Sequence, residues 1–216
     1  MHECLTCMLE LVESKYRKIW FTSDTHYQHK NICRGVSNWD EGSYTRPFLT
    51  LEEMNEAIIR NINLYVGKDD YLIHLGDWSF GGFDNIEEFR TRIECENILL
   101  VLGNHDHHIE RNRSGVQHNF QKVSHYENLT IKREVENTKH QFILSHYPIG
   151  SWQDAGKGSI HLHGHVHFTP DKKIGPGRMM DVGMDGHEEF RPYALSEVLD
   201  LVAEREIRTL DLKAYW

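Results

Sequence analysis

The sequence predicts an α/β protein, because two kinds of segment alternate along it. Short, nearly continuous apolar runs end in polar motifs, as strands buried on both faces do. Amphipathic stretches with helical spacing lie between several of these runs. The 216 residues are enough to bury a sizeable core. The sequence shows no internal repeat, low-complexity tract or linker, so we expect one domain over residues 18–216.

Five apolar runs are predicted to be strands, and each leads into a polar motif. The strands are Ile19–Thr22, Tyr71–Leu75, Ile98–Leu102, Gln141–Ser145 and Ile160–Leu162. The motifs that follow them are Asp24-Thr25-His26, Gly76-Asp77, Gly103-Asn104-His105-Asp106, His146 and Gly164-His165-Val166-His167. Ligands of α/β proteins bind beyond the carboxyl ends of the strands, so we expect the chemistry at this edge.

Three helices are predicted from their starting residues and apolar faces. Thr50 with Glu53 forms a capping-box pattern. Asp84 with Glu87 opens a second helix, and Ser196 begins a third. Their apolar faces comprise, in order, Leu51, Met54, Ile58, Ile62 and Tyr65; Ile86, Phe89 and Ile93; and Leu199 and Val202.

Residues 1–17 are predicted to form a helical N-terminal extension. Its apolar residues have the spacing of one helical face and are Leu5, Met8, Leu9, Val12 and Tyr16. We expect this helix to cover one edge of the sheet, with self-association through the extension as the alternative.

Composition and sequence pattern indicate the cellular compartment and the kinds of binding partner. The net charge of −9 disfavours binding of long nucleic acid, which depends on lysine and arginine, but bound cations would still permit a small phosphate substrate. The apolar runs are too short to span a membrane, and the N-terminus lacks the apolar core of a signal peptide. Cys33 and Cys95 are isolated, and Cys4 with Cys7 lacks the second ligand pair of a zinc site. We therefore expect a cytoplasmic protein without a membrane partner.

The five motifs together supply carboxylate, imidazole and amide side chains. This mixture of ligands suits borderline divalent metals such as Mn, Fe, Zn, Ni or Co. The motifs contain no thiolate, which argues against a structural zinc site. Each motif alone is weak evidence, but the ordered set at strand ends predicts a metal centre.

With the flanking segments 20–26 and 29–32, the motifs resemble those of the calcineurin-like metallophosphoesterase superfamily, and in particular a small single-domain branch from bacteria and phages. The resemblance covers roughly residues 18–200. It implies a four-layer αββα sandwich of two mixed β-sheets flanked by helices. It also implies hydrolysis of a phosphomonoester or phosphodiester of a small, possibly nucleotide-like substrate.

The resemblance further implies a role for each motif residue. One metal would be bound by Asp24, His26 and His167, the other by Asn104, His146 and His165, with Asp77 bridging the two. We expect manganese in both positions, with iron, zinc, nickel or cobalt as alternatives. A hydroxide shared by the metals would attack phosphorus. His105, oriented by Asp106, would be the general acid for the leaving oxygen.

Other residues beside the motifs are candidates for contacts with the substrate. His29, Asn31 and Arg46 are candidate substrate-binding residues, and for each the alternative is a surface or salt-bridge role. The aromatic residues Trp78, Tyr147 and Trp152 could stack on a base or serve only in packing.

Two alternative functions follow from the same sequence. A nuclease acting on DNA or RNA ends would use the same metal motifs, but the acidic charge disfavours it. A non-catalytic scaffold would keep the fold while losing ligands, whereas every motif position here carries the residue type that the chemistry requires.

Overall fold

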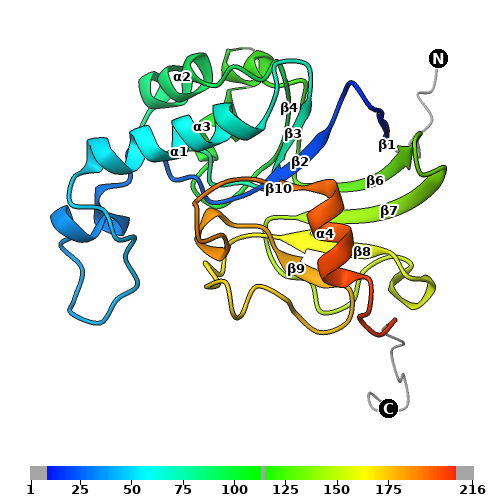
Figure 1. The fold of residues 1–216 in the computed structure, drawn as a ribbon. Coiled ribbons are helices and arrows are strands. Elements are labelled where there is room, and N and C mark those ends of the chain that lie inside the picture. The colour runs from blue at the N-terminus through cyan, green and yellow to red at the C-terminus, as the bar shows by residue number, and fades with distance from the viewer. Residues whose placement is uncertain (1–8, 113–114, 208–216) are drawn as a thin grey trace.

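The computed structural model describes residues 9–112 and 115–207, which form two five-stranded mixed sheets (Figure 1). The first sheet contains, in spatial order, β10 (Tyr193–Ala194), β2 (Ile19–Thr22), β3 (Tyr71–His74), β4 (Asn97–Val101) and β5 (Lys122–Ser124). The second contains β1 (Leu9–Glu13), β6 (Tyr126–Arg133), β7 (Thr138–Ser145), β8 (Ile160–His163) and β9 (Met179–Asp181).

The two sheets enclose the inner core of the molecule. In β2, Ile19 and Phe21 belong to the apolar cluster between the sheets, whereas Trp20 packs on the helical side. Phe21 lies against Phe142 of β7, with ring centroids 5.4 Å apart. This alternation follows from the two-residue period of a strand, which sends successive side chains to opposite faces.

Helices cover the outer face of the first sheet. They are α1 (Leu51–Tyr65), α2 (Phe83–Arg92) and the short α3 (His107–Arg111), followed by the 3-10 turn η3 (Val116–Asn119). Thr50 caps α1 as expected, because its hydroxyl accepts a hydrogen bond from the Glu53 amide at 3.1 Å. None of the described helices is long and apolar enough to cross a membrane.

Two predicted helix starts are wrong by one or two residues. Gly82, without a capping side chain, precedes α2, so Asp84 lies within the first turn rather than before it. The last helix, α4 (Leu195–Val202), begins one residue before Ser196. Its start is stabilised by Glu197, whose carboxylate accepts a hydrogen bond from the Ala194 amide at 2.7 Å.

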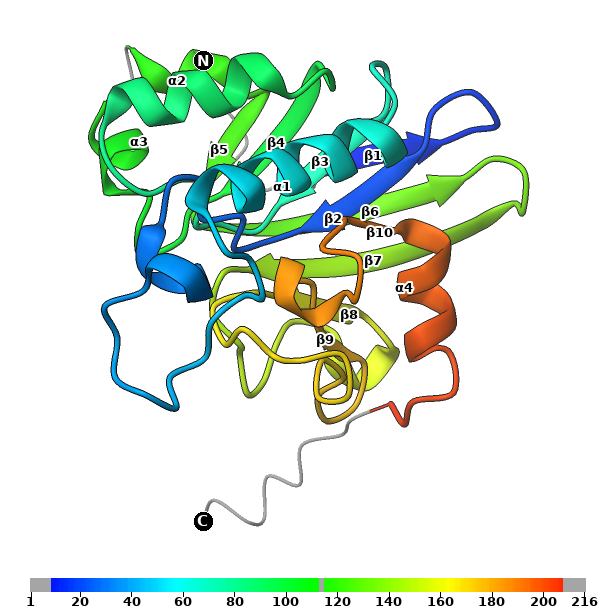
Figure 2. The same cartoon turned by 60° about the vertical axis from the view of Figure 1, so that its left-hand side comes forward.

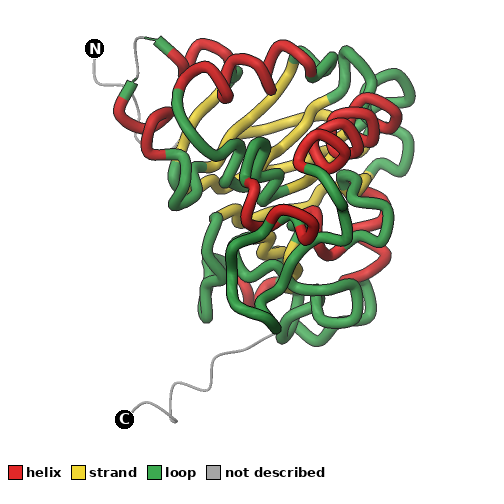
Figure 3. Tube along the Cα trace, turned by 90° about the vertical axis from the view of Figure 1, so that its left-hand side faces the viewer, coloured by secondary structure: helices red, strands yellow, loops and turns green. Residues whose placement is uncertain are grey.

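The arrangement of two mixed sheets flanked by helices is confirmed, but the helical cover is unequal. Helix α4 packs its Val198 and Val202 into the cluster between the sheets. The outer face of the second sheet carries Trp152 and the 3-10 turn η4 (Ala155–Lys157). Accordingly, loops dominate the part of the molecule away from α1 and α2 (Figure 3).

All five predicted strands are present, but the helix predicted for the N-terminal extension is wrong over its described part. Leu9–Glu13 is strand β1, which pairs in parallel with β6. Leu11 is buried between the sheets while Val12 is half exposed, so alternation, not helical spacing, describes this segment. Residues 1–8, with Cys4 and Cys7, lie outside the described residues.

Parallel pairing brings the carboxyl ends of the central strands together. β2, β3 and β4 are parallel neighbours in one sheet, and β7, β8 and β9 are parallel neighbours in the other. A bridge between Ser23 and Gly183 joins the loop after β2 to the loop after β9. Figure 2 shows these blue and orange loops on one side of the two sheets.

Candidate metal centre

The loops that carry the motifs are tied to one another by backbone hydrogen bonds. The amide of Asp24 donates to the carbonyl of Gly76 at 2.9 Å, and the amide of His26 donates to that of Asp77 at 3.0 Å. In the other sheet, the amide of Gly164 donates to the carbonyl of His146 at 2.9 Å. The pairing of neighbouring strands therefore continues past the strand ends and fixes the loops relative to one another.

Five of the seven predicted ligands have a left-handed backbone, with φ between 49° and 71°. They are Asp24, His26, Asp77, His165 and His167. Such a conformation is uncommon for residues other than glycine and costs about 1–3 kcal/mol each. Residues in this state cluster at functional sites, where the surrounding structure holds them. The local backbone thus supports a functional role for these motifs independently of the side chains.

The glycines before the ligands are required by close approach. A Cβ atom on Gly76, whose φ is +98°, would lie 2.5 Å from the amide nitrogen of Gly103 and 2.7 Å from Nδ1 of His146. At Gly164 it would clash with the side chains of Ser23 and Asp24. Only glycine leaves room for the neighbouring ligand loops at these positions.

Asp24, His26 and His167 form the first group of donor atoms. Nε2 of His26 lies 3.1 Å from Nε2 of His167. Oδ1 of Asp24 lies 3.9 Å from the first of these nitrogens and 3.6 Å from the second. The three donor atoms could therefore hold one metal ion, as predicted for these residues.

The second group is built around Asp77. Its Oδ2 lies 3.5 Å from Nε2 of His26 and 3.5 Å from Nε2 of His146. The side-chain oxygen of Asn104 lies 3.0 Å from His146 Nε2 and 3.0 Å from His165 Nδ1. Asp77 thus stands between the two groups, in the position expected for a bridging carboxylate.

Two of the predicted ligand histidines are held with Nε2 directed at the centre. His146 donates from Nδ1 to the carbonyl of Leu75 at 2.8 Å, and His167 donates from Nδ1 to Oδ2 of Asp185 at 2.7 Å. With the proton on Nδ1, the lone pair of Nε2 is free to bind a cation. The hydrogen bond to the other ring nitrogen also raises the basicity of the ligand.

The prediction that Arg46 binds the substrate is wrong, because its side chain is fully buried. Its guanidinium donates from Nε to Oδ1 of Asp185 at 2.8 Å, from NH2 to Oδ2 at 2.9 Å, and from NH1 to the carbonyl of Thr25 at 2.9 Å. NH2 also donates to the carbonyl of Asp24. Arg46 therefore fixes the loop of the first motif, which was the salt-bridge alternative.

Asp185 is the functional residue that the sequence analysis missed. It lies in the 3-10 turn η5 (Met184–Gly186), which follows β9. The sequence signal for it was weak, because β9 has only three residues, one of them Asp181, and Met184 separates Gly183 from Asp185. Although burial favours the neutral carboxyl, Arg46 holds the pKa of Asp185 well below its ordinary value.

The electrostatics of the centre favour a bound cation. Burial, with the carboxylates of Asp181 and Asp77, raises the pKa of Asp24 to about 7, although the charge of His167 opposes this. Burial holds the pKa of His26 well below its usual range, so its ring is a neutral donor. Nδ1 of His26 has no hydrogen-bond partner within the described part of the chain. Repelling carboxylates beside the neutral imidazole of His26 fit a divalent ion, whose charge would stabilise both.

The expected partnership of His105 and Asp106 is wrong. Both carboxylate oxygens of Asp106 accept backbone hydrogen bonds, from Asp77 and Gly103 at 2.8 Å and from Trp78 at 3.0 Å. Asp106 therefore joins the second motif loop to the third, and its carboxylate does not orient the ring of His105 in the part of the chain that the structure describes. His105 itself is placed by its amide, which donates to Oδ1 of Asp77 at 2.9 Å, and its ring lies 5.3 Å from that of His26.

Some of the remaining candidates for substrate contact lie near the metal centre, and the others do not. His29 lines a cavity beside the centre, whereas Asn31 accepts a hydrogen bond from the amide of Asn38 at 3.3 Å and does not line that cavity. Trp78 and Trp152 are buried in packing, as in the alternative given for them. Tyr147 is 47% exposed, and its ring centroid lies 4.6 Å from that of His165.

Comparison with known proteins places this geometry in a family. The model of the calcineurin-like phosphoesterase family matches residues 17–169. An uncharacterized protein of Methanocaldococcus jannaschii is 31% identical over 202 residues, which cover 90% of this chain and 97% of that protein. The crystal structure of AQ665 from Aquifex aeolicus, a protein of unknown function, matches with a TM-score of 0.59 at 20% identity. The structural match covers 88% of this chain and 100% of the AQ665 chain. At 20% identity, this likeness concerns the fold alone.

Proposed function

The chain belongs to the calcineurin-like phosphoesterase family and is a metal-dependent hydrolase of phosphate esters; we propose that it uses two divalent ions on a small, nucleotide-like phosphomonoester or phosphodiester. Manganese is the first choice, and iron, zinc, nickel or cobalt would suit the same donors. The position of Asp77, 3.5 Å from a histidine of each donor group, carries the proposal.

Each donor group would hold one ion. Asp24, His26 and His167 would bind the first, Asn104, His146 and His165 would bind the second, and Asp77 would touch both. When bound, such ions supply a nucleophile at neutral pH and neutralise the phosphate oxygens. The left-handed ligand loops hold the donor atoms in place before the substrate arrives, so little reorganisation is needed at the moment of reaction.

His105 would protonate the leaving oxygen. Its ring centroid lies 5.3 Å from that of His26 in the first donor group, and its amide, rather than its ring, contacts Asp77. His105 also lines the cavity beside the centre, which would give a leaving group room to depart. General-acid help of this kind is worth ~10²–10⁴-fold.

The alternatives are weaker on the same evidence. No lysine or arginine is among the described residues that line the cavity beside the centre, so a nuclease that tracks a nucleic-acid backbone is disfavoured. A scaffold would not need five strained ligand positions. Cys33 and Cys95 are buried free thiols, in keeping with the cytoplasm as the proposed compartment.

The proposal is tested with purified protein that has been chelated and then reloaded with single metals. Bis-p-nitrophenyl phosphate, p-nitrophenyl phosphate and 2′,3′-cyclic nucleotides separate diesterase from monoesterase activity. We expect hydrolysis to return with metal, and Asp77→Asn to abolish it. Activity that survives exhaustive chelation would contradict the proposal.

His105→Ala tests the assignment of the acid. We expect both ions to remain, with a loss of ~10²–10⁴-fold on an ester with an alkoxide leaving group. The loss on a p-nitrophenyl ester should be much smaller, since p-nitrophenolate departs without a proton. Equal losses on both esters, or loss of metal, would remove His105 from this role.

A further inference from the structure

A cavity of about 290 Å³ opens beside the first donor group. It is lined by three histidines of the motifs, His26, His105 and His167, and by His29, Ile32, Trp39 and Tyr44. Small-molecule sites usually measure ~300–1,000 Å³, so this cavity has room for one compact group. The four lining residues outside the motifs are mainly aromatic and include no lysine, arginine, aspartate or glutamate.

The aromatic side chains around the cavity are unusually exposed. Trp39, Tyr44 and Phe80 are 45%, 40% and 41% exposed, although each is large and apolar. Trp39 meets the ring of His29 edge-on with centroids 5.6 Å apart, and Phe80 lies 4.0 Å from the same ring. Exposed apolar side chains gathered at one place mark a binding surface.

The loop that carries Trp39 and Tyr44 is anchored to the metal centre. The Tyr44 hydroxyl donates to Oδ1 of Asp185 at 2.9 Å, and two residues later Arg46 binds the same carboxylate. Since Asp185 also holds the ligand His167, the wall of the cavity is fixed relative to the metals. An aromatic surface placed this firmly can position a substrate as well as attract it.

We propose that this cavity is a subsite for a planar aromatic group on the leaving side of the ester, namely the base of a nucleoside. A base offers a flat face for stacking on Trp39 or Tyr44, and the cavity holds one ring system. His105 also lines the cavity, and there it would give its proton to the leaving oxygen of the nucleoside. The inference rests on the proposed phosphoesterase function and names its substrate class.

The test compares esters with the same leaving oxygen. Adenosine 5′-monophosphate and ribose 5-phosphate both release the ribose O5′ and differ only in the base, and their methyl diesters form a second pair. We expect kcat/KM to be roughly 5- to 150-fold higher with the base, the range that stacking of one base supplies. Trp39→Ala should bring this ratio close to one while leaving the base-free ester unchanged. Trp39→Phe should restore part of it.

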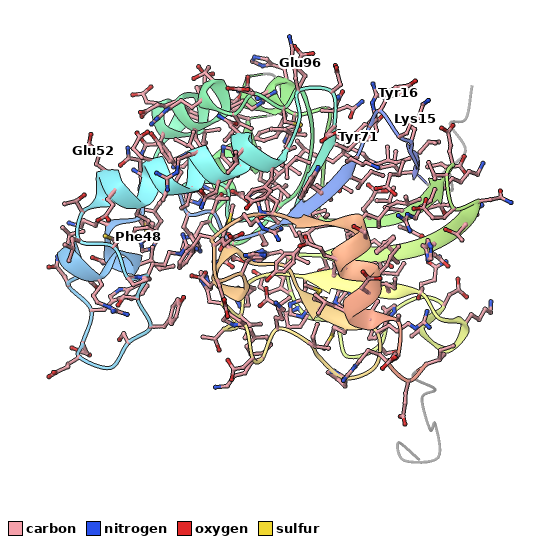
Figure 4. All side chains as sticks on the ribbon, viewed as in Figure 1. Lys15, Tyr16, Phe48, Glu52, Tyr71 and Glu96 are labelled. Carbon is pink, nitrogen blue, oxygen red and sulfur yellow. The ribbon has the colours of Figure 1, made fainter. Side chains whose placement is uncertain are left out.

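Tyr16→Ala is the matched control, because Tyr16 is 81% exposed in the turn between β1 and β2. Figure 4 shows Tyr16 on the opposite side of the molecule from Phe48, which follows the cavity loop. This variant should keep the wild-type ratio. A Trp39→Ala variant that loses activity equally on both members of a pair would show a structural role and overturn the inference, as would a wild-type protein without preference for the base.

A second readout does not depend on turnover. Adenosine, but not ribose, should bind to manganese-loaded protein in saturation-transfer NMR, and Trp39→Ala should abolish the signal. If adenosine binds in this way but no ester is cleaved with any metal, the proposed function fails while the subsite stands. If esters are cleaved and adenosine does not bind, the subsite fails while the proposed function stands.

Discussion

Asp185→Asn perturbs the side chain that joins Arg46 to the ligand His167. Asp185 and Arg46 are both fully buried, and two nitrogens of the guanidinium contact the carboxylate at 2.8 and 2.9 Å. The variant removes the negative charge and leaves the guanidinium with the backbone carbonyls of Asp24 and Thr25. Loss of one partner of a buried ion pair costs about 3–5 kcal/mol in the free energy of unfolding.

The same variant should weaken metal binding by a separate route. His167 would lose the carboxylate that accepts its Nδ1 proton and raises the basicity of Nε2. Removal of such a partner typically costs 10–100-fold in metal affinity, or about 1.4–2.8 kcal/mol. The two losses can be measured apart, by urea unfolding of the chelated protein and by competition of a metal indicator with the folded protein.

A double variant separates the two effects. Arg46→Met combined with Asp185→Asn removes the lone buried charge, so stability should recover relative to Asp185→Asn alone. Metal affinity should stay low, because His167 still lacks its carboxylate. Glu56→Gln is the control: Glu56 is half exposed and contacts Arg92 at 2.6 Å, so its loss should cost less than about 1 kcal/mol and leave metal affinity unchanged. The reasoning is refuted if Asp185→Asn unfolds and binds metal as the wild type does.

Metal content, thermal stability and acid sensitivity give further checks. About two divalent ions per chain are expected at saturation, and Asp77→Asn should lower occupancy of both positions; a single ion under saturating manganese or zinc would exclude the dinuclear centre. Metal at a hundredfold excess over Kd should stabilise the chelated protein by ~2.7 kcal/mol, and an unchanged melting temperature would contradict an ordered site. Burial lowers the pKa of His74 to about 3, below the 6.5 of an unfolded histidine, so the unfolded chain takes up the proton first and stability is lost as pH falls from 6.5 towards 3. Between pH 7.5 and pH 5, measured by urea unfolding in chelator, protonation linked to His74 should lower the free energy of unfolding by up to about 2 kcal/mol. His74→Gln should not show this loss. An equal change in the free energy of unfolding in the wild type and the variant would refute this assignment.

The fold was predictable where a local pattern had one interpretation. Long apolar runs such as Ile98–Leu102 identified the central strands, and the capping pattern at Thr50 identified α1. The prediction failed for Leu9–Glu13, where the spacing of apolar residues suits a helix but pairing with β6 decides for a strand. It also missed β5, β6, β9 and β10; all of these except the eight-residue β6 have only two or three residues and owe their existence to neighbours in the sheet.

The candidate site also has features that the sequence predicted and features that only the structure shows. The seven proposed ligand positions were predicted from the motifs together with the family resemblance, and the structure brings their side chains together beyond the strand ends. The roles of Arg46 and Asp106 could not be predicted in this way. Both are charged residues beside motifs, and only the structure shows that one is buried against Asp185 and the other against three backbone amides.

The sequence by itself determined the α/β class, the motif set and the chemistry of its donors, since these depend on residue type and short-range spacing. The tertiary structure alone decided which side chains support the ligands and what surrounds the metals. Asp185 meets His167 across 18 residues and Arg46 across 139, and Trp39 meets His29 over the cavity through the path of a loop. Such contacts depend on how sheets and loops pack in space, which local sequence patterns do not encode.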